Sequence, residues 1–191
     1  QTGAGKSTVR EILRQKGAAV IDADSVAHDI TDNNLNCIYD IVNRFSCLVL
    51  NEKGKINRKA LGKRVFSDPK ELAALNKIIF PYILEAIEHE VLAYISKGTE
   101  NIVIDGATVI ESGCGKMCDM LVSVVAEEET RITRIIKRDG ISKADAERRV
   151  SAQKPEEFYT ENSDFVIKND STKAELERNV NSVLKNMLLT K

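Results

Sequence analysis

The chain has 191 residues, of which 42% are hydrophobic and 30% charged, so it can bury a sizeable core in one compact domain. Its 28 Lys and Arg residues nearly balance its 29 Asp and Glu residues, and the formal charge of -1 argues against a nucleic-acid partner. No apolar run approaches the roughly 20 residues that span a bilayer, and no secretory signal precedes the first motif. We therefore expect a soluble cytoplasmic protein without membrane contact, either a monomer or a weak homo-oligomer.

The cysteine and histidine content predicts neither a disulfide framework nor a metal site. The four cysteines are too few for a framework in a chain of this length, and only Cys114 and Cys118 lie close together in sequence. A zinc site at this pair would need two further ligands, which the neighbouring sequence does not supply. We expect thiols at all four positions and surface or structural roles for the histidines; these residues are Cys37, Cys47, Cys114, Cys118, His28 and His89.

The first predicted helix directly follows residues 3–8. Val9, Ile12 and Leu13 recur at helical spacing, and Gly17 stands where the helix should end. The next segment, AAVIDAD at 18–24, is a short apolar run that ends in acids. It predicts a buried parallel strand with polar residues at its carboxyl end.

Residues 25–100 are predicted to be mostly helical. Ile83, Ile87, Val91 and Ile95 recur at a spacing of four residues and should form one helix face. Pro81 is expected to break or begin this helix, because it lacks the amide hydrogen that a helix interior needs.

Three further apolar runs predict strands at 101–105, 121–126 and 164–167, while the charged segments 127–155 and 173–189 are helix-prone. Short buried strands that alternate with helices predict an α/β fold with a mostly parallel sheet. With three prolines and no low-complexity tract, the chain offers no long linker that would divide it.

Residues 3–8 read GAGKST and match the end of the phosphate-loop motif G-x-x-x-x-G-K-[ST]. The first glycine of the motif would precede Gln1, and we expect a central strand before it. Glycines let backbone N–H groups turn toward a phosphate, Lys6 would bridge β- and γ-oxygens, and the Ser7 hydroxyl would join the shell of a Mg²⁺ ion. The alternative is a glycine-rich turn, but the amphipathic helix that follows favours a nucleoside triphosphate site. Its residues would be Gly3, Ala4, Gly5, Lys6, Ser7 and Thr8.

Other features narrow the class of nucleotide-binding protein. The chain lacks the Asn-Lys-x-Asp motif expected of a GTPase, and it is shorter and less basic than a typical motor or helicase. Its length fits the small-molecule kinases of the nucleoside-monophosphate kinase type. In those kinases an acid at the end of the second strand meets the acceptor, and an arginine-rich lid closes on the phosphates.

The pairing of GAGKST with VIDAD resembles the dephospho-coenzyme A kinase family, and further family elements follow in order along essentially the whole chain. These are INRKALGKRVF at 56–66, LNKIIFPYI at 75–83, TVIES at 108–112, KRDGISKADAERRVSAQ at 137–153 and DFVIKND at 164–170. The chain departs from the family pattern at Phe80, where a histidine is usual, and at 106–109, where GATV replaces a Val-Pro-Leu-Leu type run.

The resemblance implies that the chain uses ATP and Mg²⁺ to phosphorylate the ribose 3'-hydroxyl of dephospho-coenzyme A. It also implies a three-layer α/β/α phosphate-loop fold with a mostly parallel sheet. Residues 1–29, 101–136 and 161–191 would form the nucleotide-binding core. Residues 30–100 would form a helical insertion that holds the coenzyme A moiety, and residues 137–160 a lid.

The resemblance also assigns roles in phosphoryl transfer. Asp24 would orient and deprotonate the acceptor hydroxyl, although an acid here could instead cap the next helix. Asp22 should point to the other side of the strand, where it would hold Mg²⁺ through water or order the loop. Arg138 would contact ATP and stabilise charge on the migrating phosphoryl group, because its guanidinium offers paired donors and stays protonated.

Further residues are predicted to contact the two substrates. Arg149, followed by Gln153, would be a second phosphate contact, and Asn169 would touch the adenine of ATP, with a turn residue as the alternative. Arg58 and Glu111 are candidates on the acceptor side, with a surface salt bridge as the alternative for each. The other basic residues nearby are expected mostly on solvated helix faces; they are Arg131, Arg134, Lys137 and Arg148.

Two other functions stay open at this point. One is another small-molecule or nucleotide kinase of the same fold, and the other is a nucleotide-gated binding module without phosphotransfer. The VIDAD acid and the whole-chain pattern disfavour the first, and the presence of Asp24 and Arg138 beside Lys6 disfavours the second. The kinase hypothesis requires Lys6 and Asp24 to face each other across an open cleft.

Overall fold

The computed structural model describes residues 1–189, with side chains described to residue 187, and confirms the predicted α/β class. Its contacts divide the chain into two compact units, which are described separately. The first unit contains Gln1–Val20 and Gly115–Lys191, and the second contains Ile21–Cys114. Residues 21–29 and 101–114, which the sequence analysis assigns to the nucleotide-binding core, therefore group with the helical segment by their contacts.

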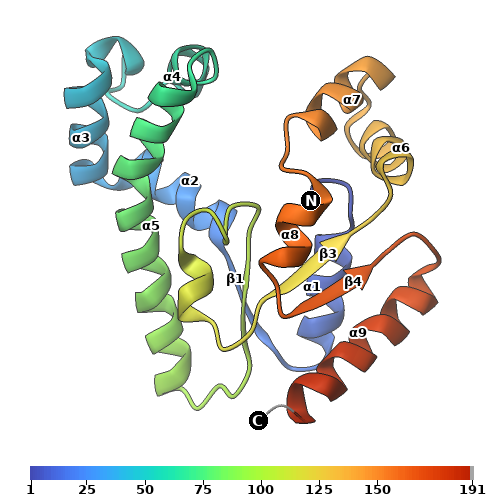
Figure 1. The fold of residues 1–191 in the computed structure, drawn as a ribbon. Helices are drawn as coiled ribbons and strands as arrows, with labels where there is room; N and C mark the ends of the chain where they lie inside the picture. The colour runs from blue at the N-terminus through green and yellow to red at the C-terminus, as the bar shows by residue number, and fades with distance from the viewer. Residues whose placement is uncertain (190–191) are drawn as a thin grey trace. The chain divides into compact units, whose positions relative to one another are not determined.

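The first unit has a two-stranded parallel sheet of β3 (Val122–Val125) and β4 (Phe165–Lys168), drawn side by side in Figure 1. Helix α1 (Lys6–Gln15) and helix α9 (Lys173–Leu189) contact each other, and α9 also contacts β4. Their apolar faces meet the sheet in one core, to which β3 contributes the buried Val124 and β4 the buried Ile167. This core contains Ala4, Val9, Ile12, Val124, Ala126, Ile167, Leu176 and Val180.

Three helices connect β3 to β4, as a parallel pair of strands requires. They are α6 (Glu128–Asp139), α7 (Lys143–Ser151) and α8 (Glu156–Glu161). Gly140 ends α6 in the left-handed conformation, and the Ser142 side chain caps α7. Helices α6 and α7 pack on a small core of their own, formed by Ile132, Ile135, Ala146 and Val150.

The second unit is mostly helical. Strand β1 (Ala19–Asp22), which crosses the boundary between the units, pairs with β2 (Ile102–Asp105). The helices are α2 (Ala23–Asn33), α3 (Leu35–Phe45), α4 (Arg58–Val65) and α5 (Pro69–Ser96), and Figure 1 shows α3 and α4 beside the amino-terminal part of α5. The largest fully buried side chains of this core include Ile21, Ile41, Phe45, Val65 and Ile87.

Helix α5 runs through Pro81 without a break, so the prediction that Pro81 breaks or begins a helix is wrong. The helix begins instead at Pro69, directly after the capping residue Asp68. Proline removes one backbone hydrogen bond from a helix interior. Leu75 before it and Ile83 after it are nevertheless buried in one core, and this shared packing holds both halves in a single helix.

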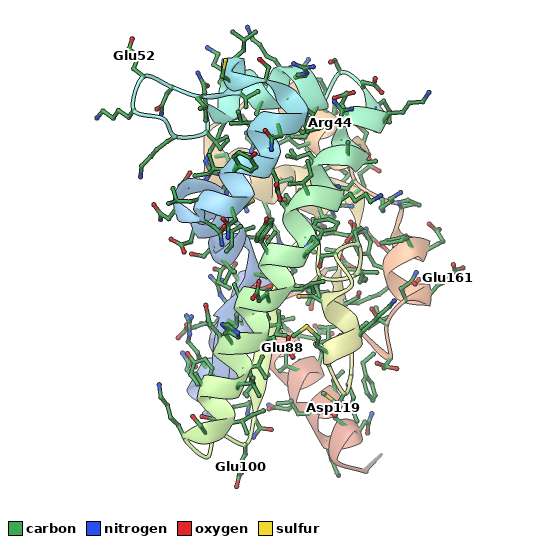
Figure 2. All side chains as sticks on the ribbon, turned by 90° about the vertical axis from the view of Figure 1, so that its left-hand side faces the viewer. Arg44, Glu52, Glu88, Glu100, Asp119 and Glu161 are labelled. Atoms are coloured by element: carbon green, nitrogen blue, oxygen red, sulfur yellow. The ribbon has the colours of Figure 1, made fainter. Side chains whose placement is uncertain are left out.

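The predicted apolar face of α5 is only partly buried. Ile83 and Ile87 belong to the core and Val91 packs against it, whereas the Ile95 side chain is 56% exposed. Figure 2 shows α5 along its length, with Glu88 on the helix and Glu100 beyond its carboxyl end. Among residues 1–189, no helix combines the length and apolar character needed to cross a membrane.

Candidate active site

The phosphate loop of residues 1–5 leads directly into α1. Gly3 and Gly5 have φ angles of 75° and 96°, which L side chains rarely adopt. A Cβ atom on Gly3 would lie 2.8 Å from the carbonyl oxygen of Arg131, and one on Gly5 would lie 2.2 Å from Nδ2 of Asn169. Both positions therefore require glycine for backbone conformation and for close packing.

The amino terminus of α1 is suited to an anion. Gly5 occupies the capping position and supplies no side-chain acceptor, and the first turn contains no acidic residue. The Thr8 amide donates to the Gly5 carbonyl oxygen at 3.0 Å, so the Lys6 and Ser7 amides and the positive end of the helix dipole are left to an external anion. Lys6 and Thr8 are half-buried in this turn, and the Ser7 side chain is exposed. A glycine-lined loop with an ammonium and two hydroxyl groups fits a nucleotide phosphate and its Mg²⁺ ion.

Side chains from α6 and from the segment after α7 hold the outer side of this loop. Nε of Arg131 donates to the carbonyl oxygen of Thr2 at 3.0 Å, and Nη2 of Arg131 donates to Oε1 of Gln153 at 2.6 Å. The same Gln153 oxygen accepts from the amide of Thr2 at 2.9 Å. Arg131 is only 6% exposed, and burial lowers the pKa of its guanidinium.

The expectation of a solvated helix face is therefore wrong for Arg131. A sequence signal exists, since Arg131 lies four residues before the buried Ile135 and so shares its helix face. Arg134 is half-buried and donates to the Asn169 carbonyl oxygen at 2.8 Å and to the Gly3 carbonyl oxygen at 3.5 Å. A guanidinium serves as a structural donor when its surroundings offer several carbonyl oxygens.

Asn169 follows β4, as predicted, and its side chain is buried. Its Nδ2 atom donates to the Ala4 carbonyl oxygen at 2.7 Å, and its backbone amide donates to the Val125 carbonyl oxygen at 2.9 Å. The structure thus places Asn169 against the phosphate loop. Its contact with adenine stays a prediction.

Arg138 and Arg149 meet at one carboxylate that the sequence analysis does not single out. Nε and Nη2 of Arg138 lie 2.7 and 2.9 Å from the two oxygens of Asp139, and Nη1 of Arg149 lies 2.6 Å from Oδ2 of the same residue. The hydrogen bond from Arg138 lowers the pKa of Asp139 and raises that of Arg138. Both guanidinium groups are more than half exposed, so the cluster lies at the surface of α6 and α7.

The acids of VIDAD lie in the second unit, and the structure corrects their local geometry. Strand β1 ends at Asp22, whose Oδ1 atom caps α2 by accepting from the Ser25 amide at 3.0 Å. Asp24 lies in the first turn of α2, so the argument from alternating strand faces does not apply to it. The capping role considered for Asp24 belongs to Asp22.

Asp24 is exposed, and its carboxylate is held from the loop after β2. Its Oδ1 atom accepts from the Ala107 amide at 3.1 Å. A Cβ atom on Gly106 would lie 2.9 Å from Cβ of Ala23 and 3.5 Å from Oδ1 of Asp24. Gly106 therefore allows this loop to approach the amino terminus of α2 closely. The unusual GATV segment begins at this contact.

The two acceptor-side candidates are exposed. Nη2 of Arg58 lies 2.9 Å from Oδ1 of Asp32 and also donates to the His28 carbonyl oxygen, so Arg58 joins α4 to α2. Glu111 lies in the turns between β2 and the short 3-10 helix at Cys114–Met117. Phe80 is half-buried and packs against the core. Contacts of these residues with a substrate stay predictions.

The candidate residues thus lie in both units. The phosphate loop, Arg138, Arg149 and Asn169 belong to the first, and the remaining candidates, including Asp24, belong to the second. That Lys6 and Asp24 face each other stays a prediction.

Comparison with known proteins gives one consistent result. Residues 1–175 match the CoaE family model, described as dephospho-CoA kinase. The dephospho-CoA kinase of Bacillus cereus is 32% identical over 183 residues, covering 96% of this chain and 92% of that protein. The enzyme of the same name from Oryza sativa subsp. japonica is 34% identical over 184 residues, covering 96% and 80%.

Solved structures agree with this result. The crystal structure of TT1252 from Thermus thermophilus has a TM-score of 0.79 and 29% identity, covering 97% of this chain and 93% of that one. The dephospho-CoA kinase from Campylobacter jejuni has a TM-score of 0.67 and 27% identity, covering 96% and 91%.

Proposed function

The chain belongs to the dephospho-CoA kinase family, and we propose that it transfers the γ-phosphoryl group of ATP to the ribose 3'-hydroxyl of dephospho-coenzyme A. The products are coenzyme A and ADP. The observation that carries the proposal is the phosphate loop: two glycines in the left-handed conformation lead into a helix whose first turn has no acid of its own. This loop stands in a chain that matches the family over 1–175.

The phosphate loop binds the β- and γ-phosphates of ATP in this proposal. Backbone amides of the loop and the first turn of α1 donate to the phosphate oxygens, and Lys6 adds a positive charge beside the γ-phosphate. The Ser7 hydroxyl and phosphate oxygens would hold a Mg²⁺ ion, which would supply further positive charge when bound. Residues 1–189 contain no cluster of three or more His, Cys, Asp or Glu side chains that could hold a metal, so the ion would take its other ligands from phosphate and water.

Asp24 accepts the proton of the acceptor. The 3'-oxygen forms a bond to the γ-phosphorus, the bond from that phosphorus to the β–γ bridging oxygen breaks, and ADP leaves. The proton of the 3'-hydroxyl passes to the Asp24 carboxylate. The hydrogen bond from Ala107 fixes the orientation of this carboxylate before substrate binds.

Arg138 and Arg149 stabilise the charge of the transferring phosphoryl group from the lid, residues 137–160. Both guanidinium groups are exposed and already lie together at Asp139, so they can reach one phosphate as a pair. Residues 30–100 hold the coenzyme A moiety, with Arg58 and Glu111 on the acceptor side. Asn169 contacts the adenine of ATP.

The proposal is tested by following ADP release with a panel of acceptors. We expect turnover with dephospho-coenzyme A, and at least a hundredfold lower kcat/KM with nucleoside monophosphates and with shikimate. Turnover with a nucleoside monophosphate alone would contradict the choice of substrate. ADP release at the same rate with no acceptor would contradict phosphotransfer.

A further inference from the structure

Two consecutive peptide groups of the phosphate loop are anchored from outside by a closed set of hydrogen bonds. The amide of Thr2 donates to Oε1 of Gln153, and the carbonyl oxygen of Thr2 accepts from Nε of Arg131. Nη2 of Arg131 closes the set by donating to the same oxygen of Gln153. Both backbone groups of Thr2 are therefore engaged by side chains more than 100 positions away, as the separations of 151 and 129 residues show.

We propose that Arg131 and Gln153 are positioning residues for ATP, which set the direction of the phosphate-loop amides by holding Thr2. The proposal rests on the proposed binding of ATP to this loop. Neither residue contacts the phosphates in it. Gln153, predicted only as the neighbour of a phosphate-contacting arginine, here acts on the loop backbone.

The effect on the loop follows from peptide geometry. The described peptide bonds are all trans, so each carbonyl points opposite to the N–H of the next residue. With the Thr2 carbonyl turned outward to Arg131, the Gly3 amide is turned inward. The Ala4 carbonyl is turned outward in the same way, to Asn169, which turns the Gly5 amide inward. Arg131 and Gln153, which together we call the clamp, and Asn169 thus fix two donors for an anion, the amides of Gly3 and Gly5.

Burial makes the clamp rigid. Arg131 is 6% exposed, and Gln153 is half-buried. The Arg131 backbone lies against Gly3, where an added Cβ atom would approach its carbonyl oxygen to 2.8 Å. A guanidinium can serve both acceptors at once because its donors diverge in a fixed plane, whereas an ammonium on a flexible stem cannot reproduce that geometry.

Gln153 also links the loop to the proposed lid. It lies directly after Ala152, the residue that caps the carboxyl end of α7. The clamp therefore joins α6, the end of α7 and the phosphate loop at one point. Removal of the clamp should weaken ATP binding more than binding of the acceptor, because the amides that it orients face the nucleotide.

The primary test compares two variants of nearly equal size. Gln153→Met removes the shared acceptor, whereas Gln153→Glu keeps an acceptor for the Thr2 amide and for Arg131. We expect Gln153→Met to raise the Kd for ATP about tenfold, because it loses a buried charge-assisted hydrogen bond. The Kd of Gln153→Glu should stay within about threefold of the wild type. The KM for dephospho-coenzyme A should change less than about twofold in both.

Arg131→Lys supplies a second measurement, with Arg148→Lys as the matched control. We expect Arg131→Lys to weaken ATP binding about tenfold, because one ammonium cannot hold both acceptors in the fork geometry. Arg148 is an exposed arginine of α7 that pairs with Asp145, and its replacement should leave the Kd for ATP unchanged. ATP binding is measured by direct titration, and thermal unfolding identifies any variant that does not fold.

The outcomes separate this inference from the proposed function. Wild-type ATP affinity in Gln153→Met, or equal weakening in Gln153→Met and Gln153→Glu, would overturn the clamp. Lys6→Ala serves as the reference for the loop itself: if it bound ATP as the wild type does, the proposed nucleotide site would be wrong. A wild-type protein that binds ATP but does not phosphorylate dephospho-coenzyme A would contradict the proposed function. The ATP titrations of the Gln153 and Arg131 variants would still decide whether the clamp exists.

Discussion

Two local features place Asp24: the cap of α2 by Asp22, and the contact from the loop after β2. Asp22 ends β1 and caps α2, which makes the chain turn into a helix before Asp24. Gly106 leaves room for the following amide to approach, and that amide holds Oδ1 of Asp24. An exposed carboxylate with a fixed orientation is suited to accept a proton from a bound hydroxyl group.

Replacing Asp24 by asparagine tests this role. Asparagine keeps the acceptor for the Ala107 amide but cannot take up a proton, so we expect kcat to fall about a hundredfold or more, with little change in the Kd for ATP. Asp29→Asn is the matched control, because Asp29 is an exposed acid of the same helix. Equal losses in kcat and in ATP affinity would indicate a structural role for Asp24.

Asp22 should behave differently. Asp22→Ala removes the cap of α2, and we expect it to lower the free energy of unfolding by about 1 kcal/mol, whereas Asp22→Asn keeps most of the stability because asparagine caps helices well. Chemical denaturation measures both. If Asp22→Asn were as stable as the wild type but needed far more Mg²⁺ for activity, the predicted contact with the ion would explain Asp22 better than the cap.

At the scale of elements, Asp139 joins α6 to α7 through Arg149, while its other partner, Arg138, is its neighbour in α6. These arginines lower its pKa, so the folded protein holds the charged carboxylate more strongly than the unfolded chain does. The resulting stabilisation is fully present above the unfolded pKa of about 3.9 and is lost as the pH falls through the lower folded value. The exposure of the arginines makes the contribution small and sensitive to salt.

The difference in Tm between the wild type and Asp139→Asn should therefore depend on pH. We expect the wild type to melt higher at neutral pH and the difference to disappear as the pH falls through the lowered pKa of Asp139, since both proteins are then uncharged at this position. Raising the ionic strength should reduce the difference at neutral pH. A difference that grew toward acid pH would contradict the assigned ion pairs.

The sequence predicted the helices and strands better than it predicted the long-range contacts that fix side-chain positions. Apolar runs correctly predicted the four strands found in residues 1–189, because short buried strands have a local signature. Asp24, in contrast, lies in a helix whose start depends on a cap. The break expected at Pro81 failed because packing of α5 on both sides outweighs one lost hydrogen bond. Arg131 was missed because the carbonyl that it serves lies 129 residues away in sequence.

At the scale of the whole molecule, the resemblance covers both compact units, and the proposed reaction needs groups from each. In the proposed reaction ATP binds to the first unit, whereas the proton acceptor belongs to the second. We therefore expect substrate binding to reduce the motion of segments that contact the reacting groups. The proposed lid, residues 137–160, is the main candidate.

Hydrogen exchange tests the lid. We expect amide exchange in residues 137–155 to slow when ATP and dephospho-coenzyme A are added together, and to slow less with either ligand alone. The protection should fall in Arg138→Met, because that variant loses the guanidinium that we propose contacts the phosphoryl group. Unchanged exchange in this segment with both ligands bound would contradict a closing lid.

The position of the new phosphate tests the central claim most directly. After reaction with ATP and dephospho-coenzyme A, phosphorus NMR should show a new phosphomonoester whose resonance couples to the 3'-hydrogen of the ribose. A phosphate on any other atom of the acceptor, or no new phosphomonoester while ATP is consumed, would contradict the account.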